Sequence, residues 1–161
     1  MNFVSLEDLP KKIPIFPLTG AVLFPKTQLP LNIFEPRYVQ MLNAALATPH
    51  KLIGMIQPIA GSDKSLKKVG CVGRVTSYNE TDDHRYLITL NGIIRFEIEN
   101  ELDTTTQYRQ VEVNYENFIT DLKSEDVTNV DRDSLLKLIK KYLKNKSLLA
   151  DWDIIQQTPT E

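Results

Sequence analysis

The sequence predicts a mainly β domain with some helix, followed by a C-terminal helical subdomain, and three observations predict it. Eight of the nine prolines lie within the first 58 residues, where they favour extended segments because proline fixes φ and lacks an N–H donor. Short apolar runs bounded by turn residues follow between residues 69 and 115. After Phe118 the apolar residues take helical spacing. We therefore place the β domain at residues 1–118 and the start of the helical subdomain at 119–161.

Composition limits the class of protein. The chain has 161 residues, 42% hydrophobic and 25% charged, which is ordinary globular composition with enough length to bury a core. The formal net charge of −2 disfavours a general nucleic-acid binder, because no overall positive field attracts a phosphate backbone. The sequence has no signal-peptide pattern and no apolar run of about 18 residues or more. We expect a cytoplasmic protein without a membrane span.

The first 34 residues are expected to be extended. Residues 13–18 contain Pro14 and Pro17, so they are predicted to form an edge strand or a polyproline-like segment, not a central strand. Gly20 gives a turn. Residues 21–25 and 29–34 are then predicted as two further short strands, each interrupted by proline.

A helix is predicted to begin at Glu35-Pro36, because proline is favoured at the first helical position. It should end near Thr48-Pro49. Five apolar residues follow the start at i, i+3, i+4, i+7 and i+8, which is the spacing of one helix face: Tyr38, Met41, Leu42, Ala45 and Leu46.

The middle of the chain is predicted to be a run of strands. Residues 51–57 form a buried strand, 58–68 a polar loop, and the later strands cover 69–78, 86–90, 93–98 and 108–115. Asn91-Gly92 is typical of a type I′ hairpin, which we prefer to the alternative of a glycine bend within one long strand. In the last strand, Val111, Val113 and Tyr115 alternate with Glu112 and Asn114, as one buried and one exposed face require.

The C-terminal part has a helical pattern. Residues 128–131 offer a capping pattern, and an apolar stripe at Leu135, Leu138, Ile139, Tyr142 and Leu143 lies opposite four lysines that we interpret as a solvated face. Residues 148–155 continue the helical spacing. Residues 158–161 have the pattern of a helix start with no helix after it, so we infer a truncated chain or an unusual terminus.

No residue pattern indicates catalysis or metal binding. The scattered glycines form no phosphate loop, which excludes an ATPase. One cysteine and two histidines lack the spacing of a zinc site, and we interpret Cys71 as a small buried hydrophobe. Asp82-Asp83-His84 could be a carboxylate–imidazole pair, but it lies in a polar stretch between strands and is better interpreted as an exposed loop tip. We predict no catalytic residue, no cofactor and no metal.

Several segments together resemble a known family. Residues 13–18 (IPIFPL), 22–25 (VLFP) and 29–38 (LPLNIFEPRY) with Met41-Leu42 are followed by GCVGRV at 70–75 and LNGIIRF at 90–96. This pattern resembles the Lon substrate-binding domain, the N-terminal domain of Lon proteases, in its stand-alone bacterial form. The resemblance covers residues ~10–118 well and the helical part more loosely.

The resemblance implies a PUA-like pseudo-barrel β domain and a non-enzymatic role, since the ATPase and the serine–lysine protease of Lon lie in other domains. It marks seven signature positions: Pro25, Glu35, Pro36, Arg37, Tyr38, Gly92 and Arg95. From the residue chemistry, we interpret Glu35 and Arg37 as a structural cap and clamp at the helix start. Glu35, Arg37, Tyr38 and Arg95 are expected to hold the helix against the sheet.

The leading functional hypothesis is a module that binds unfolded or apolar polypeptide segments, with a protease or chaperone as a further partner. Proline-interrupted strands leave a sheet edge at which a peptide strand could pair. The candidate binding residues Phe16, Phe24, Leu31 and Phe34 lie in proline-bounded segments whose alternate side chains cannot all face one core; the competing interpretation places most of them in the barrel core. The alternative functions are an RNA-binding PUA-like module or a structural adaptor, and an enzyme only if the Asp-Asp-His turn is catalytic. The oligomeric state stays open.

Overall fold

The computed structural model describes residues 5–60, 62–83, 85–123 and 131–157. The chain divides into two compact units, Met1–Lys123 and Ser124–Glu161. The predicted domain border at residue 118 falls inside η2 (Glu116–Leu122), the short 3₁₀ helix that ends the described part of the first unit. A shorter 3₁₀ helix, η1 (Leu6–Asp8), lies near the N-terminus.

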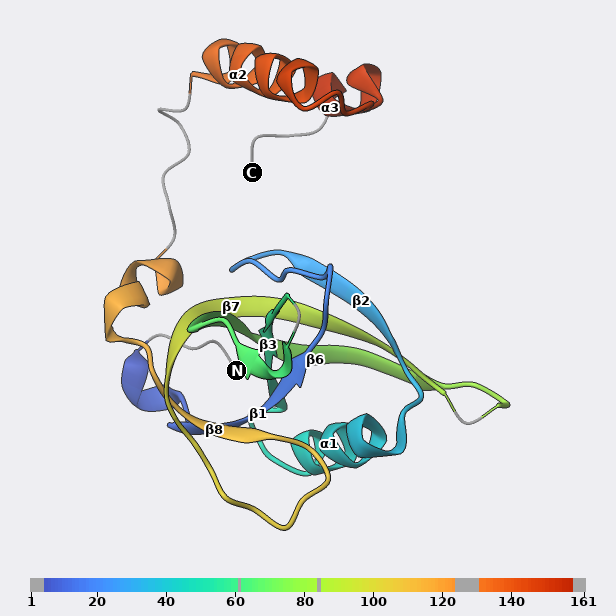
Figure 1. Ribbon diagram of the computed structural model, residues 1–161, viewed down its shortest axis with the longest axis vertical. Helices are drawn as coiled ribbons and strands as arrows, with labels where there is room; N and C mark the ends of the chain where they lie inside the picture. The colour runs from blue at the N-terminus through green and yellow to red at the C-terminus, as the bar shows by residue number, and fades with distance from the viewer. Residues whose placement is uncertain (1–4, 61, 84, 124–130, 158–161) are drawn as a thin grey trace. The chain divides into compact units, whose positions relative to one another are not determined.

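The first unit is a sheet that closes on itself, as Figure 1 shows. Its strand order is β2-β7-β6-β3-β1-β8, and β7 also pairs with β8, so five strands form a ring and β2 extends it beside β7. The mainly β class with some helix is thereby confirmed. The six strands are β1 (Lys12–Pro17), β2 (Gln28–Ile33), β3 (Leu52–Ile56), β6 (Val69–Glu80), β7 (Tyr86–Glu101) and β8 (Gln110–Asn114).

Strand β1 is not an edge strand, and this part of the prediction is wrong. It lies between β8, which pairs with its first half, and β3, which pairs in parallel with its second half. Ile15 N donates to Arg109 O on the β8 side, whereas Leu18 N donates to Ile56 O on the β3 side. Because N–H groups alternate along a strand, Pro14 lacks its donor toward β3 before that ladder begins. Pro17 lacks its donor toward β8 after that ladder ends.

Two segments differ from the prediction. Residues 21–25, predicted as a strand, have no strand pairing: 21–24 run as an extended loop, and Pro25 begins a turn. Residues 58–68, predicted as a loop, contain a small two-stranded sheet of β4 (Pro58–Ile59) and β5 (Ser62–Leu66). The 21–24 loop is held by hydrogen bonds to side chains and within a turn, not by the backbone pairing of a strand. Its apolar residues therefore contribute to packing although the segment belongs to no sheet.

Strand β7 is one long curved strand (Figure 1), so the preferred hairpin at Asn91-Gly92 is wrong and the glycine bend is correct. Strand β6 pairs with β7 from Tyr86 to Glu97, β2 pairs with its first half on the other side, and β8 pairs with its last residues from Glu97. The ladder with β6 shifts register between Val72 and Gly73, where Gly73 lies opposite Gly92. A bulge increases local bending, and here it allows one strand to serve both sides of the ring.

Helix α1 (Pro36–Leu46) confirms the predicted helix, with Tyr38, Met41, Leu42 and Ala45 buried. It packs against β1 and β3. All five residues of β3 are buried because its two faces pack into two apolar clusters. Ile53 and Met55 join the cluster under α1, and Leu52 and Ile56 join the cluster that includes Phe96.

The second unit contains α2 (Arg132–Asn145) and α3 (Trp152–Gln157), neither of which has a buried residue. Asp131 caps α2, with its Oδ1 accepting from Ser134 N at 3.1 Å, which satisfies one of the free N–H groups of the first turn. The rest of the predicted cap at 128–131 and the pattern at 158–161 lie outside the described residues. None of the described helices is both long and apolar enough to cross a membrane.

Candidate functional site

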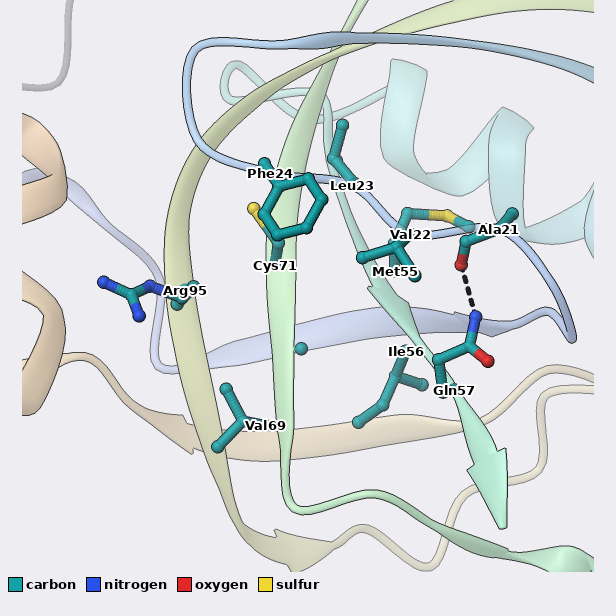
Figure 2. A pocket seen from close by; sticks show the side chains of 11 residues that line it. Ala21, Val22, Leu23, Phe24, Met55, Ile56, Gln57, Val69, Cys71 and Arg95 are labelled. Carbon is teal, nitrogen blue, oxygen red and sulfur yellow. Dashed lines mark hydrogen bonds between the residues drawn. The ribbon is translucent and has the colours of Figure 1, made fainter. Parts of the chain in front are cut away.

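A groove of about 170 Å³ lies between the 21–24 loop and strands β3 and β6 (Figure 2). Its floor is apolar and closely packed, because Met55, Ile56 and Cys71 are 2–3% exposed. Gly70 completes the floor, where a Cβ would overlap the ring of Phe96. The floor therefore offers apolar surface at the bottom of an open depression.

The rim of the groove exposes apolar side chains. Val22 is 55% exposed, Phe24 61% and Val69 43%, whereas Leu23, between the first two, is 4% exposed and lies in the core under α1. This alternation follows from the extended course of the loop, in which successive side chains point to opposite sides. Large apolar side chains that remain exposed around a depression are typical of an interaction site.

The loop is fixed by contacts with β7. Lys26 N donates to Gly92 O at 2.8 Å, Gly92 N donates to Thr27 O at 2.8 Å, and Thr27 Oγ1 donates to Phe24 O at 2.9 Å. A Cβ on Gly92 would overlap the carbonyl of Phe24. The signature position Gly92 therefore allows the loop backbone to lie directly on β7, which holds Phe24 at the rim.

At the opposite wall, the amide nitrogen of Gln57 donates to the carbonyl oxygen of Ala21, as Figure 2 shows, and also to that of Leu18. These two bonds fix the start of the loop to the end of β3. The 21–24 loop is thus bonded to the sheet at both of its ends. Its backbone is therefore fixed where Val22 and Phe24 are exposed.

Arg95 marks the charged end of the groove. Its Nε and Nη2 donate to Asp121 Oδ2 and Oδ1 at 2.9 and 2.7 Å, and its backbone N also donates to Oδ2 at 3.0 Å. These bonds hold the pKa of the Asp121 carboxyl below its usual range, although its burial raises it. The Arg95 guanidinium carbon lies 4.8 Å from the centre of the Phe118 ring. Arg95 therefore ties η2 to β7, and its bonds do not reach α1.

The groove contains no reactive pair. Burial raises the pKa of the Cys71 thiol to about 12, so the thiol stays protonated near neutral pH, which agrees with its interpretation as a small hydrophobe. Among the described residues, no group of three or more His, Cys, Asp or Glu side chains could hold a metal ion. At the Asp-Asp-His turn, Asp83 and Arg85 form an exposed ion pair at 2.7 Å.

The structure separates the four predicted binding residues. Phe24 lies at the groove rim. Phe16 is only 5% exposed and packs against Tyr38 with ring centres 4.2 Å apart and ring planes tilted by 44°. For this residue the competing interpretation, barrel core, is the correct one, because β1 turns the side chain into the core under α1. Leu31 is half-buried against the same core. Phe34 is 59% exposed but lies outside the groove lining, under the guanidinium of Arg85.

The signature residues around the start of α1 lie in a second place. Pro36 occupies the first turn, and Glu35 stands at the cap position but makes no side-chain cap. Its Oε2 accepts from Arg37 Nη2 at 2.8 Å instead, so the clamp forms and the cap does not. The Arg37 guanidinium carbon lies 4.5 Å from the centre of the Tyr38 ring. Pro25 belongs to the turn after the groove loop, immediately before Lys26, whose φ is 64°.

Sequence reasoning did not single out Val22, Val69, Met55 or Gln57 as site residues. For Val22 a signal existed, because it alternates with Leu23 and Phe24 in one short extended segment. For Val69, Met55 and Gln57 no local signal existed, because they reach the groove only through the pairing of β3 with β6.

Comparison with known proteins identifies the family. The family described as "ATP-dependent protease La (LON) substrate-binding domain" matches residues 12–159, and the chain belongs to this family. A Lon protease of Roseiflexus castenholzii is 30% identical over 159 residues, which cover 95% of this chain and 18% of that protein. Lon protease 2 of Sorangium cellulosum is 29% identical over 119 residues, which cover 70% of this chain and 15% of that protein. The chain thus spans less than a fifth of the length of these relatives.

Solved structures show the same fold. The N-terminal domain of a Mycobacterium avium complex Lon protease superposes with a TM-score of 0.61 at 14% identity, covering 91% of this chain and 73% of that one. The Lon N-terminal domain protein of Xanthomonas campestris superposes with a TM-score of 0.59 at 19% identity, covering 93% and 84%. Family and fold agree, because the family match and the superposed structures both point to the Lon N-terminal substrate-binding domain.

Proposed function

We propose that this chain is a non-catalytic module that binds unfolded or apolar polypeptide segments in the groove beside the 21–24 loop. The observation that carries the proposal is the exposure of Val22, Phe24 and Val69 around an apolar floor. An apolar side chain of a client would remove these surfaces from water, and burial of one large apolar side chain contributes about 1.5–3 kcal/mol. Family membership supports polypeptide as the ligand class.

A non-catalytic role is supported by the chemistry of the groove. Its only charged lining residue is Arg95, whose guanidinium is bonded to Asp121, and its thiol is protonated. A general acid or base would need a titratable group within hydrogen-bond reach of a substrate. The described lining residues supply binding surface and no such group.

The test is a titration with an unfolded model polypeptide, read by fluorescence anisotropy, on the whole chain and on two matched variants. Phe24→Ala removes an aromatic ring from the rim, and we expect the dissociation constant to rise about tenfold. Phe34→Ala removes an equally exposed ring outside the groove, and we expect a change below twofold. Both side chains are largely in solvent, so neither variant should alter the urea midpoint.

The two variants make the result decisive. Saturable binding that Phe34→Ala weakens and Phe24→Ala leaves unchanged would place the site at the β2 end of the sheet and not in the groove. The complete absence of saturable binding by the folded wild-type chain would remove the proposed function.

A further inference from the structure

A second cavity of about 240 Å³ lies where four segments meet. These segments are the end of β1 with the residues after it, the first turn of α1, strand β4, and the residues that lead into β8. Its lining differs in kind from that of the groove, because it contains two arginines, two tyrosines and an amide. The lining residues are Pro17, Thr19, Arg37, Tyr38, Pro58, Gln107, Tyr108 and Arg109.

The cavity is lined by cations whose carboxylate partners do not line it. Arg37 pairs with Glu35 through Nε and Nη2, both on one oxygen, at 3.0 and 2.8 Å. Arg109 pairs with Glu101 through Nε and Nη2, each at 2.6 Å. Neither glutamate lines the cavity. Two arginines therefore contribute to the lining without their paired carboxylates.

The hydroxyl groups of Tyr38 and Tyr108 add donors. In the described part of the chain neither hydroxyl makes a hydrogen bond, and neither is a buried atom without a partner, so both hydroxyls reach solvent on residues that line the cavity. Burial raises the pKa of Tyr38 most, the charge of Arg37 lowers it, the charge of Glu35 raises it, and the charge of Arg109 lowers it. Both guanidinium charges and the Glu35 carboxylate thus act at the position of this ring. Gln107 N donates to Gln40 Oε1 at 3.0 Å, which fixes the Gln107 side of the cavity to α1.

The cavity shares a wall with the apolar groove. Gln57 lines the groove and the next residue, Pro58, lines the cavity. In the segment after β1, Ala21 lines the groove and Thr19 lines the cavity. The two bonds of the Gln57 amide to Leu18 and Ala21 hold this wall together. The groove and the cavity are therefore lined by neighbouring residues of the same two segments.

We propose that this cavity binds a carboxylate group of a polypeptide held in the groove, either a chain terminus or an acidic side chain. The inference rests on the proposed polypeptide-binding function and adds charge selectivity to it. A guanidinium is planar, with donors matched to the two oxygens of a carboxylate. The Nη1 donors of Arg37 are not used by Glu35, and the tyrosine hydroxyls can donate to the same anion.

The experiment compares three fluorescent peptides that share one apolar sequence. One ends in a free carboxylate, one in an amide, and one in an amide with a glutamate next to the end. We expect the free-acid peptide, the glutamate peptide or both to bind at least fivefold more tightly than the plain amide, and the pattern identifies the source of the carboxylate. The advantage should shrink as salt is raised, because screening weakens exposed charge pairs.

Two variants and one control assign the effect to the cavity. Arg37→Gln should reduce the carboxylate advantage below twofold, and Tyr108→Phe should reduce it partly by removing a single hydroxyl. Arg85→Gln is the matched control, because Arg85 also pairs with a carboxylate two residues away and also lies over an aromatic ring, that of Phe34. Arg85→Gln should keep the full advantage.

The outcomes separate this inference from the function on which it rests. If the amide peptide binds saturably and neither carboxylate peptide binds more tightly, the groove stands and the carboxylate site is wrong. If the carboxylate advantage survives Arg37→Gln and disappears in Arg85→Gln, the anion binds elsewhere and the inference is also wrong. If none of the peptides binds, the polypeptide-binding function itself fails.

Discussion

The closed sheet and the helical unit differ in how they use apolar residues. In the unit that contains the sheet, the eleven largest fully buried side chains, nine from strands and two from α1, are all less than 2% exposed and fill the space inside the ring and under α1. In the helical unit, α2 and α3 have no buried residue, and Leu138 and Leu149 are 64% and 102% exposed. The free energy of folding is therefore concentrated in the sheet.

This difference predicts where substitutions matter. A side chain stabilises a fold in proportion to the apolar surface that it removes from water and to the packing it completes. Changes inside the ring should lower the free energy of unfolding by several kcal/mol, and changes on α2 should barely alter it. The following experiments order these effects from the largest to the smallest.

The largest effect is expected from Phe96→Ala. Phe96 is 0% exposed and fills the space left by two glycines, since a Cβ on Gly54 or Gly70 would meet its ring. Removing the ring leaves a cavity that rigid strands cannot close, which costs about 3–5 kcal/mol. Urea unfolding followed by circular dichroism measures the loss. A loss below 1 kcal/mol would mean that the strands close around the cavity, which would contradict the rigid packing of the sheet.

The next effect is expected from Gly92→Ala. Its Cβ would overlap the carbonyl of Phe24, so the groove loop must move away from β7, and such overpacking costs about 1–3 kcal/mol. The binding of unfolded polypeptide should weaken together with stability, because the same loop presents Phe24. Gly73→Ala is the control, since its Cβ meets only side-chain atoms, the end of Leu23 at 2.6 Å and Leu90 Cβ at 3.1 Å, and no backbone atom. An equal loss of stability in the two variants would contradict a backbone clash as the cause.

Gly92 shows which features could be predicted from the sequence and which could not. The periodicity of α1 and the alternation of Val111, Val113 and Tyr115 are local, and the structure confirms both. Asn91-Gly92 has the local chemistry of a hairpin, yet the contact that decides its role is with Phe24, far away in the chain. The chain therefore forms a continuous strand here in place of a hairpin turn, because Gly92 packs against the backbone of Phe24. The prediction of an edge strand from Pro14 and Pro17 is wrong for the same reason, because β1 changes its pairing partner between the two prolines.

The candidate site was predictable only in part, for the same reason. Phe24 was named from its own segment, and Phe16 was named by the same argument although it is buried. Nothing in the local sequence distinguishes the two, because the distinction is set by which neighbour each segment packs against. The second cavity brings Arg37 and Arg109 together from α1 and the start of β8. No spacing rule joins positions so far apart.

An intermediate effect is expected from Asp121→Asn, which tests the attachment of η2 to the sheet. Arg95 lowers the folded-state pKa of Asp121, so the ionised carboxylate contributes stability above its ordinary pKa of about 3.9. That contribution is lost as pH falls through the lowered folded-state value. At pH 7 we expect a loss of about 1–2 kcal/mol, because charge-assisted bonds to a partly exposed arginine are replaced by weaker ones.

Stability measured from pH 7 to pH 2 gives the check. The wild-type chain should lose more stability than Asp121→Asn on acidification, so that their difference narrows toward pH 2. Asp83→Asn is the control, because Asp83 also has a lowered pKa but is exposed beside Arg85 at the β6–β7 turn. Its pH profile should stay closer to that of the wild type than the Asp121→Asn profile does, because water screens this exposed ion pair and leaves only a small pH-dependent contribution to stability. A constant difference between wild type and Asp121→Asn at all pH values would show that the ion pair does not couple folding to protonation.

The smallest effect is expected from Leu138→Ala on α2, compared with Leu90→Ala on β7. Leu90 is 0% exposed, and its truncation should cost about 2–5 kcal/mol. Leu138 is 64% exposed, so its truncation should change the free energy of unfolding of the sheet by less than about 0.5 kcal/mol. Hydrogen exchange of the β7 amides reports the sheet alone, and the fluorescence of Trp152, the single tryptophan, reports the helical unit.

The two reporters also test whether the units unfold separately. If the sheet carries its own stability, the Trp152 transition should come at lower urea than the loss of β7 protection, because two-state unfolding requires coincident transitions. Coincident transitions together with a large loss in Leu138→Ala would mean that the apolar stripe of α2 contributes to the core. The contrast between the two units would then fail, and the exposed leucines would count among the residues that stabilise the fold.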